Sequence, residues 1–167
     1  HPPLGYSVFV RYEVTVPRTM DMDLYTRNGG ITVGGVEGAV EAETRGGNIH
    51  LSDTLGPANL YTAEGIIRVA DVDGTVDAET GSGGVRLENV TGRARLRTST
   101  GSISVVEGQG LVRVRSFRGD IELRGFRGPA DLHTVGGDIR ASFTRLRESS
   151  VLITARGSMR LEILAED

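Results

Sequence analysis

A glycine recurs every 18 residues along most of this chain, and this spacing restricts the possible folds more than any other feature. When coils of 18 residues are counted from Met22, position 7 is glycine in seven successive coils: Gly29, Gly47, Gly65, Gly83, Gly101, Gly119 and Gly137. Glycine makes up about 7% of an average protein, so such a column does not arise by chance. No insertion interrupts residues 22–147. A uniform repeat of this length predicts a stack of similar units, as in solenoid proteins.

Other positions of the coil repeat with the same regularity. With the first residue as position 0, positions 0, 2, 9 and 11 are apolar in every coil, and position 4 is threonine or serine. Position 16 is glycine in six of the seven coils. The apolar positions alternate with polar ones, which is the period of a strand with one buried face. We therefore expect two short strands per coil, with corners at the glycines, where positive φ is allowed.

The predicted fold is an all-β, single-stranded parallel β-helix, or β-solenoid. A coil of 18 residues cannot bury its apolar positions alone, whereas stacking coils about 4.8 Å apart pairs each strand with its equivalent. The usual hand of parallel crossovers favours a right-handed helix. The threonine column has inward parity, so we expect its hydroxyls to bond to backbone groups at the corner. A helical fold is disfavoured, because each interior glycine would cost about 1 kcal/mol.

We expect one domain, with residues 1–21 as a strand or cap and residues 22–167 as the solenoid of seven coils and a partial one. Residues 6–16 alternate in polarity and predict a longer strand before Pro17. Near the other end, the repeat shifts by about three residues around 147–150. The last partial coil would use Val151, Ile153, Met159, Leu161 and Ile163 as apolar positions. No capping element is evident there, so this end is predicted to present an open β edge.

Composition excludes several classes of function. The net charge of −3 gives no general attraction to nucleic acid. There is no cysteine for disulfides. No apolar run approaches the roughly 20 residues of a transmembrane helix. The charges are unevenly distributed, because residues 1–90 hold 13 acids and 6 arginines, whereas residues 91–167 hold 9 acids and 13 arginines.

The uneven charge distribution points to a candidate ligand-binding cluster. Outward positions 1 and 3 of the fifth and sixth coils are Arg95, Arg97, Arg113 and Arg115. In a stacked solenoid these side chains form a two-by-two group about 5 Å apart along the axis. Adjacent like charges repel unless they are paired, and the arginine fork matches carboxylate and phosphate groups. We therefore predict an anionic partner, either a polysaccharide or an envelope protein.

A second candidate surface is acidic. The same two positions in the second and fourth coils hold carboxylates, and tyrosines lie beside them, so the predicted partner-binding residues are Glu41, Glu43, Asp77, Glu79, Tyr25 and Tyr61. The acidic half of one molecule could dock on the basic half of another. Such a head-to-tail contact would allow self-association.

The sequence shows no arrangement typical of a catalytic, cofactor or metal site. His50 and His133 lie five coils apart, about 24 Å, and cannot share a metal ion. Asp120 and Asp138 share position 8, but the other coils hold no acid there, which disfavours a calcium repeat. Solenoid enzymes that act on polysaccharides usually carry long loops that wall a cleft, and this repeat has none. We predict a protein that is not an enzyme; a polysaccharide-active enzyme is the least favoured alternative.

The recurring Thr-x-x-Gly-x-Ile-x-Val, followed by Val-x-Gly, is similar to an adhesin-like family of bacterial β-strand-repeat domains of unknown function. Residues 12–17, Tyr-Glu-Val-Thr-Val-Pro, which lead into residues 24–31, look like the usual start of that family. The resemblance covers about residues 8–165. It implies a β-solenoid in bacterial envelope-associated proteins and hence an extracytoplasmic or cell-surface location, with adhesion as the role and no catalytic residues.

Two functions are expected from these features. The first is a non-catalytic, adhesin-like module that binds an anionic glycan or protein partner. The alternative is a structural scaffold that self-associates or polymerises through the ends of the solenoid.

Overall fold

The structure is a computed structural model that describes residues 16–145 and 149–164. All regular elements of these residues are strands. Within the described residues there is no helix that is long and apolar enough to span a membrane. In chain order the strands are β1 (Met22–Thr26), β2 (Ile31–Gly34), β3 (Val40–Gly46), β4 (Ile49–Leu55), β5 (Ala58–Glu64), β6 (Ile67–Asp73), β7 (Val76–Ser82), β8 (Val85–Thr100), β9 (Ile103–Arg118), β10 (Ile121–Arg127), β11 (Ala130–Gly136), β12 (Ile139–Arg145), β13 (Val151–Arg156) and β14 (Met159–Ile163).

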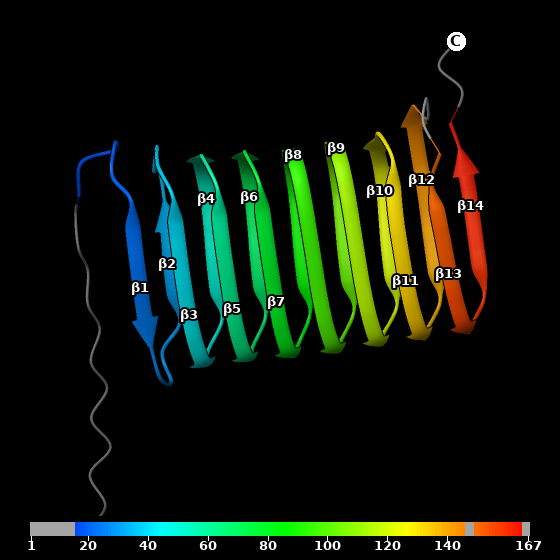
Figure 1. Cartoon of the computed structure of the whole chain (residues 1–167), viewed down its shortest axis with the longest axis horizontal. Coiled ribbons are helices and arrows are strands. Elements are labelled where there is room, and N and C mark those ends of the chain that lie inside the picture. The colour runs from blue at the N-terminus through cyan, green and yellow to red at the C-terminus, as the bar shows by residue number, and fades with distance from the viewer. Residues whose placement is uncertain (1–15, 146–148, 165–167) are drawn as a thin grey trace, which may run out of the picture.

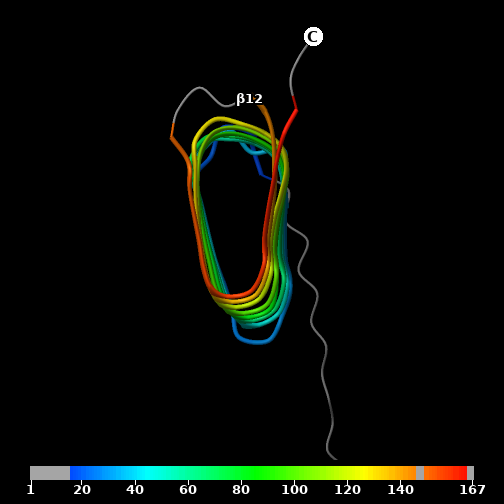
Figure 2. The same ribbon diagram turned by 90° about the vertical axis from the view of Figure 1, so that its right-hand side faces the viewer.

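The strands stack as a parallel β-solenoid, which confirms the predicted fold (Figure 1). Viewed along the stack, successive coils overlie one another as a flattened loop with two long sides (Figure 2). Residues pair with their equivalents 18 positions on, for example Val40 with Ala58 and Ile49 with Ile67. We call the side that holds coil positions 0–6 sheet 1, formed by β1, β3, β5, β7, the second halves of β8 and β9, β11 and β13. Sheet 2 holds positions 9–15, formed by β2, β4, β6, the first halves of β8 and β9, β10, β12 and β14.

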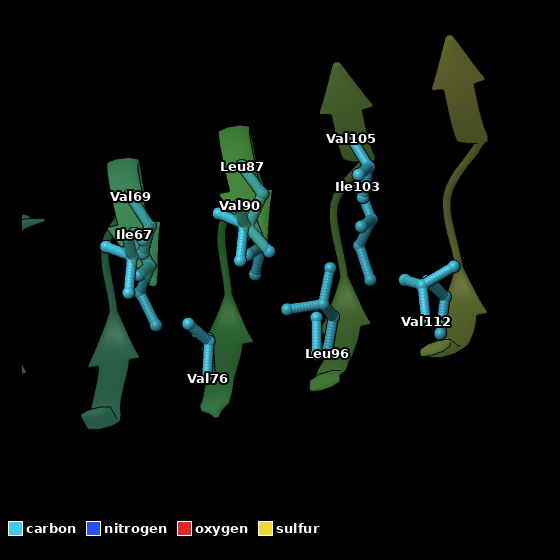
Figure 3. Close-up of a cluster of buried hydrophobic side chains, with 14 of the residues drawn as sticks. Ile67, Val69, Val76, Leu87, Val90, Leu96, Ile103, Val105 and Val112 are labelled. Atoms are coloured by element: carbon cyan, nitrogen blue, oxygen red, sulfur yellow. The ribbon is translucent and has the colours of Figure 1, made fainter. Parts of the chain in front are cut away.

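The core between the two sheets is thin and made largely of aliphatic side chains (Figure 3). Ile67, Leu87 and Ile103 are fully buried, as the repeating apolar columns predict. Position 14 also faces inward and is less regular. A Cβ atom added to Gly108 would lie 3.0 Å from Cε2 of Phe126, so this ring occupies the space that the glycine leaves free. Packing therefore combines a small residue in one coil with a large one in the next.

The threonine column points inward and bonds to the corner, as predicted. From the second coil onward, the threonine hydroxyls of this column donate to the carbonyl of the position-7 glycine in the preceding coil, at 2.9–3.1 Å. The donors are Thr44, Thr62, Thr80, Thr98, Thr134 and Thr154. Ser116 takes this place in the sixth coil, and its buried Oγ has no hydrogen-bond partner among the described residues. The ladder thus satisfies corner carbonyls that the strands leave unpaired.

The glycine columns have a steric cause in addition to their backbone conformation. Gly83 has φ of 143°, which favours glycine, as the sequence predicts. A Cβ at this position would also overlap the carbonyl of Gly65 in the coil below. The same overlap recurs at Gly101 and Gly119, because each corner rests directly on the previous one.

Position 13 carries a backbone feature that the repeat analysis does not reveal. Asp53, Asp71, Asn89 and Glu107 have φ of 50–53°, in the left-handed region. Aspartate and asparagine adopt this conformation more readily than most residues, whereas glutamate does not. The left-handed residue bends the strand, and position 14 then faces the core although position 13 is exposed. The column of Asp, Asn and Gly was the available signal for this bulge.

The stack begins upstream of the predicted boundary at Met22. The amide of Glu37 donates to the carbonyl of Arg18 at 2.7 Å, and Thr19 pairs with Glu37 as the repeat requires. The long strand predicted over residues 6–16 lies outside the described residues, apart from Val16.

The C-terminal shift is two residues rather than the predicted three. Leu132 pairs with Leu152, and Ile139 pairs with Met159, which are separations of 20 in place of 18. Val151 and Ile153 therefore point outward and are exposed, contrary to the prediction. The sequence analysis placed both side chains on the buried face of the strand, whereas they lie on the exposed face. A one-residue error in register exchanges the two faces of a strand.

Candidate functional site

The four candidate arginines lie together on the outer face of sheet 1, near the middle of the stack. Arg95 pairs in register with Arg113, and Arg97 with Arg115. They lie on the adjacent strands β8 and β9 (Figure 1). All four are exposed, because positions 1 and 3 alternate with the buried residues of the same strands. The two-by-two arrangement predicted from the repeat is therefore present; we call it the arginine cluster.

Carboxylates of the adjacent coils flank the arginine cluster on both sides. Arg95 Nη1 lies 3.4 Å from Asp77 Oδ2, and Arg97 Nη1 lies 3.5 Å from Glu79 Oε2. On the other side, Arg113 Nε lies 4.0 Å from Asp131 Oδ2. These pairs reduce the repulsion that the sequence argument attributes to the cluster. The carboxylates lie one coil away from the arginines, at the same coil positions, so these ion pairs could have been predicted from the repeat.

Arg115 is the member of the cluster with no ion pair among the described residues. Its neighbours in register are Arg97 on one side and His133 on the other. The Nε2 atom of His133 lies 2.7 Å from Asp131 Oδ1, and Oδ2 of the same carboxylate faces Arg113, so Asp131 lies nearer to these two side chains in sequence register than to Arg115. Arg115 is therefore the arginine of the cluster whose charge no carboxylate of the described residues offsets.

The predicted acidic surface is divided in the structure. Asp77 and Glu79 lie on β7 and form ion pairs with Arg95 and Arg97 of the arginine cluster. Glu41 and Glu43 lie two coils further away on β3, separated from them by Asn59 and Tyr61 of β5. Tyr25 of β1 pairs in register with Glu43, and both tyrosines are exposed. Glu41, Glu43, Tyr25 and Tyr61 therefore form a separate acidic and aromatic surface.

An aromatic side chain adjoins the arginine cluster at the edge of sheet 1. Phe117 of β9 is exposed, and Arg118 Cζ lies 5.5 Å from the centroid of its ring. Sequence reasoning missed this pair, because positions 5 and 6 are not conserved in type from coil to coil. The pair adds a cation and an apolar platform beside Arg115.

The two histidines lie on opposite sheets, and the aspartates of position 8 bond to the backbone of the next coil. His50 lies on β4 of sheet 2 and His133 on β11 of sheet 1. The carboxylates of Asp120 and Asp138 each accept the backbone amide of the residue one coil further on, Asp138 and Ser158, at 2.8 Å. Within residues 16–145 and 149–164, no group of three or more His, Cys, Asp or Glu residues is arranged to hold a metal ion.

Sheet 2 has a different surface with two hollows. The larger, of about 410 Å³, lies over β10, β12 and β14, and its charged walls form the ion pairs Arg124–Glu122 and Arg160–Glu162. The smaller, of about 240 Å³, lies over β4, β6 and β8. Such open hollows offer contact to a surface-bound group rather than enclosure of a substrate.

No family model, curated protein or solved structure matches this chain.

Proposed function

We propose that this protein is a non-catalytic binding module that presents the flat face of sheet 1 to an anionic polysaccharide of the bacterial cell envelope. The observation that carries the proposal is the arginine cluster, in which two pairs of arginines lie in register and Arg115 has no acidic partner among the described residues. The adhesin-like resemblance of the repeat supports an extracytoplasmic location.

The ion pairs of the arginine cluster leave capacity for an external anion. Arg95, Arg97 and Arg113 keep 44–49% of their side-chain surface exposed. A guanidinium has five N–H donors, and one carboxylate uses at most two of them in a bidentate pair. An anionic polymer along the solenoid axis would meet arginines of two successive coils. Because the strands hold the side chains at fixed spacing, binding orders little of the backbone.

Retention on an immobilised polyuronate tests this proposal. The wild-type chain should be retained at low ionic strength and released as salt rises, since exposed charges are screened beyond about 10 Å at 0.1 M. The double variant Arg97→Gln/Arg115→Gln should elute at clearly lower salt. The charge-matched control Arg124→Gln/Arg160→Gln, on sheet 2, should be retained like the wild type. Equal retention of all three proteins would refute the role of the arginine cluster.

An acidic protein surface is a second partner with the same chemistry. Phe117 beside Arg118 offers an apolar contact that a protein could use. Binding to a polyuronate but not to an acidic protein, or the reverse, distinguishes the two partners.

Self-association is the alternative function, and the C-terminal coil favours it. Met159, Leu161 and Ile163 continue the buried columns, yet they are 51–60% exposed, whereas Ile139, Ala141 and Phe143 beneath them are at most 3% exposed. The first coil of a second copy carries Ile31 and Val33 in the matching columns of sheet 2. Stacking of one end on the other would extend both sheets.

Light scattering after size-exclusion chromatography tests the alternative. End stacking predicts assembly that increases with concentration and resists salt, because apolar burial is not screened. Leu161→Glu should abolish it, and Val135→Glu, on the exposed face of sheet 1, should not. Docking of Glu41 and Glu43 on the arginine cluster would instead weaken with salt. A monomer at every concentration would exclude both forms of self-association.

A further inference from the structure

Several arginines on the outer face of sheet 2 follow a simple pairing rule. Arg86, Arg124 and Arg160 each contact a carboxylate two residues away on their own strand, because such residues point to the same face. The pairs are Arg86–Glu88 at 2.5 Å, Arg124–Glu122 at 2.5 Å and Arg160–Glu162 at 3.0 Å. Arg140 follows the rule through Asp138, at 3.2 Å.

Arg68 on β6 does not follow this rule. The residues two positions away on either side are Ile66 and Ala70, so its own strand offers no carboxylate. Its neighbours in register are His50 on β4 and Arg86 on β8. Within the described residues Arg68 has no ion pair or hydrogen bond, although its side chain is exposed and Arg86 beside it is paired with Glu88.

The missing carboxylate leaves a hollow. Ala70 pairs in register with Glu88. Ala70 therefore occupies the coil position at which the next coil holds Glu88, the partner of Arg86. The smaller hollow of sheet 2, of about 240 Å³, lies there and is lined by His50, Arg68, Val69, Ala70, Arg86 and Glu88. It has a small apolar floor at Ala70 and cationic or hydrogen-bonding side chains along position 10.

We propose that this hollow binds the carboxylate of a small acid or acidic sugar, seated over Ala70 and held by the guanidinium fork of Arg68. The bound carboxylate would pair with Arg68 in the same way that the carboxylate of Glu88 pairs with Arg86 in the next coil. His50 contributes a ring N–H donor on one flank, and the body of the ligand rests on Ala70. This site lies on the opposite sheet from the arginine cluster and does not depend on the function proposed for it.

Glu88 sets the charge of the ligand. Its carboxylate is adjacent to the place above Ala70, and Arg86 neutralises only part of its field. A second negative charge on the ligand would be repelled, so a monoanionic carboxylate is favoured over the dianion of phosphate. Because Arg68 is exposed and makes one bidentate contact, the expected affinity is weak, with Kd on the order of millimolar.

Titration of the ¹⁵N-labelled protein with glucuronate, followed by NMR, tests this site. We expect saturable shifts in the amides of Val69, Ala70 and Glu88, and none with methyl glucoside, which lacks the carboxylate. Arg68→Gln should weaken binding by roughly tenfold or more, since it removes a charge-assisted pair. Arg115→Gln, on sheet 1, should leave these shifts unchanged, so the two sites can fail independently.

The decisive variant is Ala70→Glu, which supplies the absent carboxylate from within the chain. It should abolish glucuronate binding without loss of stability, because residue 70 is partly exposed and the adjacent strand β8 holds such a pair at the same two positions. Ser142→Glu makes a similar change beside Arg140 and should bind glucuronate as the wild type does. Undiminished binding by Ala70→Glu would overturn the proposal. Equal or tighter binding of phosphate would overturn the assignment of the ligand as a carboxylate.

Discussion

Thr80 Oγ1 donates a hydrogen bond of 3.0 Å to the carbonyl of Gly65, a residue of the preceding coil. The two residues belong to the two most regular columns of the sequence, and the bond explains why both columns persist. Gly65 turns the chain where no Cβ fits, and Thr80 satisfies the carbonyl that this turn leaves in the interior. One polar contact is thus repeated along the stack and joins successive coils, except at Ser116 of the sixth coil.

Thr80→Val should lower the free energy of unfolding by about 1–3 kcal/mol, because valine keeps the shape but leaves the Gly65 carbonyl unpaired. Urea denaturation followed by circular dichroism measures the change. Thr32→Val is the matched control, since Thr32 is exposed on sheet 2, and it should stay within about 0.5 kcal/mol of the wild type. Equal losses for the two variants would show that the corner bond has no special value.

Ser116→Thr should stabilise the protein by about 0.5–1.5 kcal/mol. Ser116 occupies the threonine column with its hydroxyl unpaired among the described residues, and the added methyl group restricts χ1 as it does in the neighbouring coils. The unfolding midpoint in urea should rise. Ser116→Ala should be close to neutral, since no hydrogen bond is lost. A cost for Ser116→Ala as large as that for Thr80→Val would contradict this interpretation.

Gly137→Ala and Gly136→Ala are adjacent substitutions with opposite expected outcomes. Gly137 has φ of 151°, and a Cβ there would overlap the carbonyl of Gly119, so we expect a loss of about 3 kcal/mol or more. A Cβ on Gly136 would approach only Phe117 O, at 3.9 Å, so alanine should be tolerated. Thermal unfolding of both variants compares them directly. Similar melting temperatures would rule out steric stacking as the cause of the glycine column.

Glu107→Asn should increase stability by roughly 1 kcal/mol, because Glu107 has φ of 50° and asparagine tolerates this conformation better than glutamate. Asn89 already occupies the same position one coil earlier, and its Nδ2 donates to Asp71 Oδ1 at 2.6 Å. Gln109→Asn, at an exposed position outside the bulge, serves as the control and should bring no gain. Chemical denaturation resolves this difference, and a decrease for Glu107→Asn would disprove the strain argument.

The sequence was sufficient to predict the stacking, the inward threonines and the grouping of Arg95, Arg97, Arg113 and Arg115. All three depend on residues 18 positions apart, and a fixed interval places such residues side by side. The prediction was less accurate at Val151 and Ile153, where the interval changes to 20 and the exposed face was exchanged with the buried one. The repeat predicts which residues are neighbours only where the interval stays at 18 residues.

The sequence by itself determined the architecture. The coils bury the same positions, and a contact that recurs from coil to coil requires the same residue type at the same position. Only the tertiary structure decided the character of the surface. It showed that Asp77, Glu79 and Asp131 engage three of the candidate arginines while Arg115 has no such partner among the described residues, and that Ala70 leaves a hollow beside Arg68. These features depend on how far each side chain extends and on which residues the neighbouring coils hold at the same positions. They differ from coil to coil, so no repeat in the sequence reveals them.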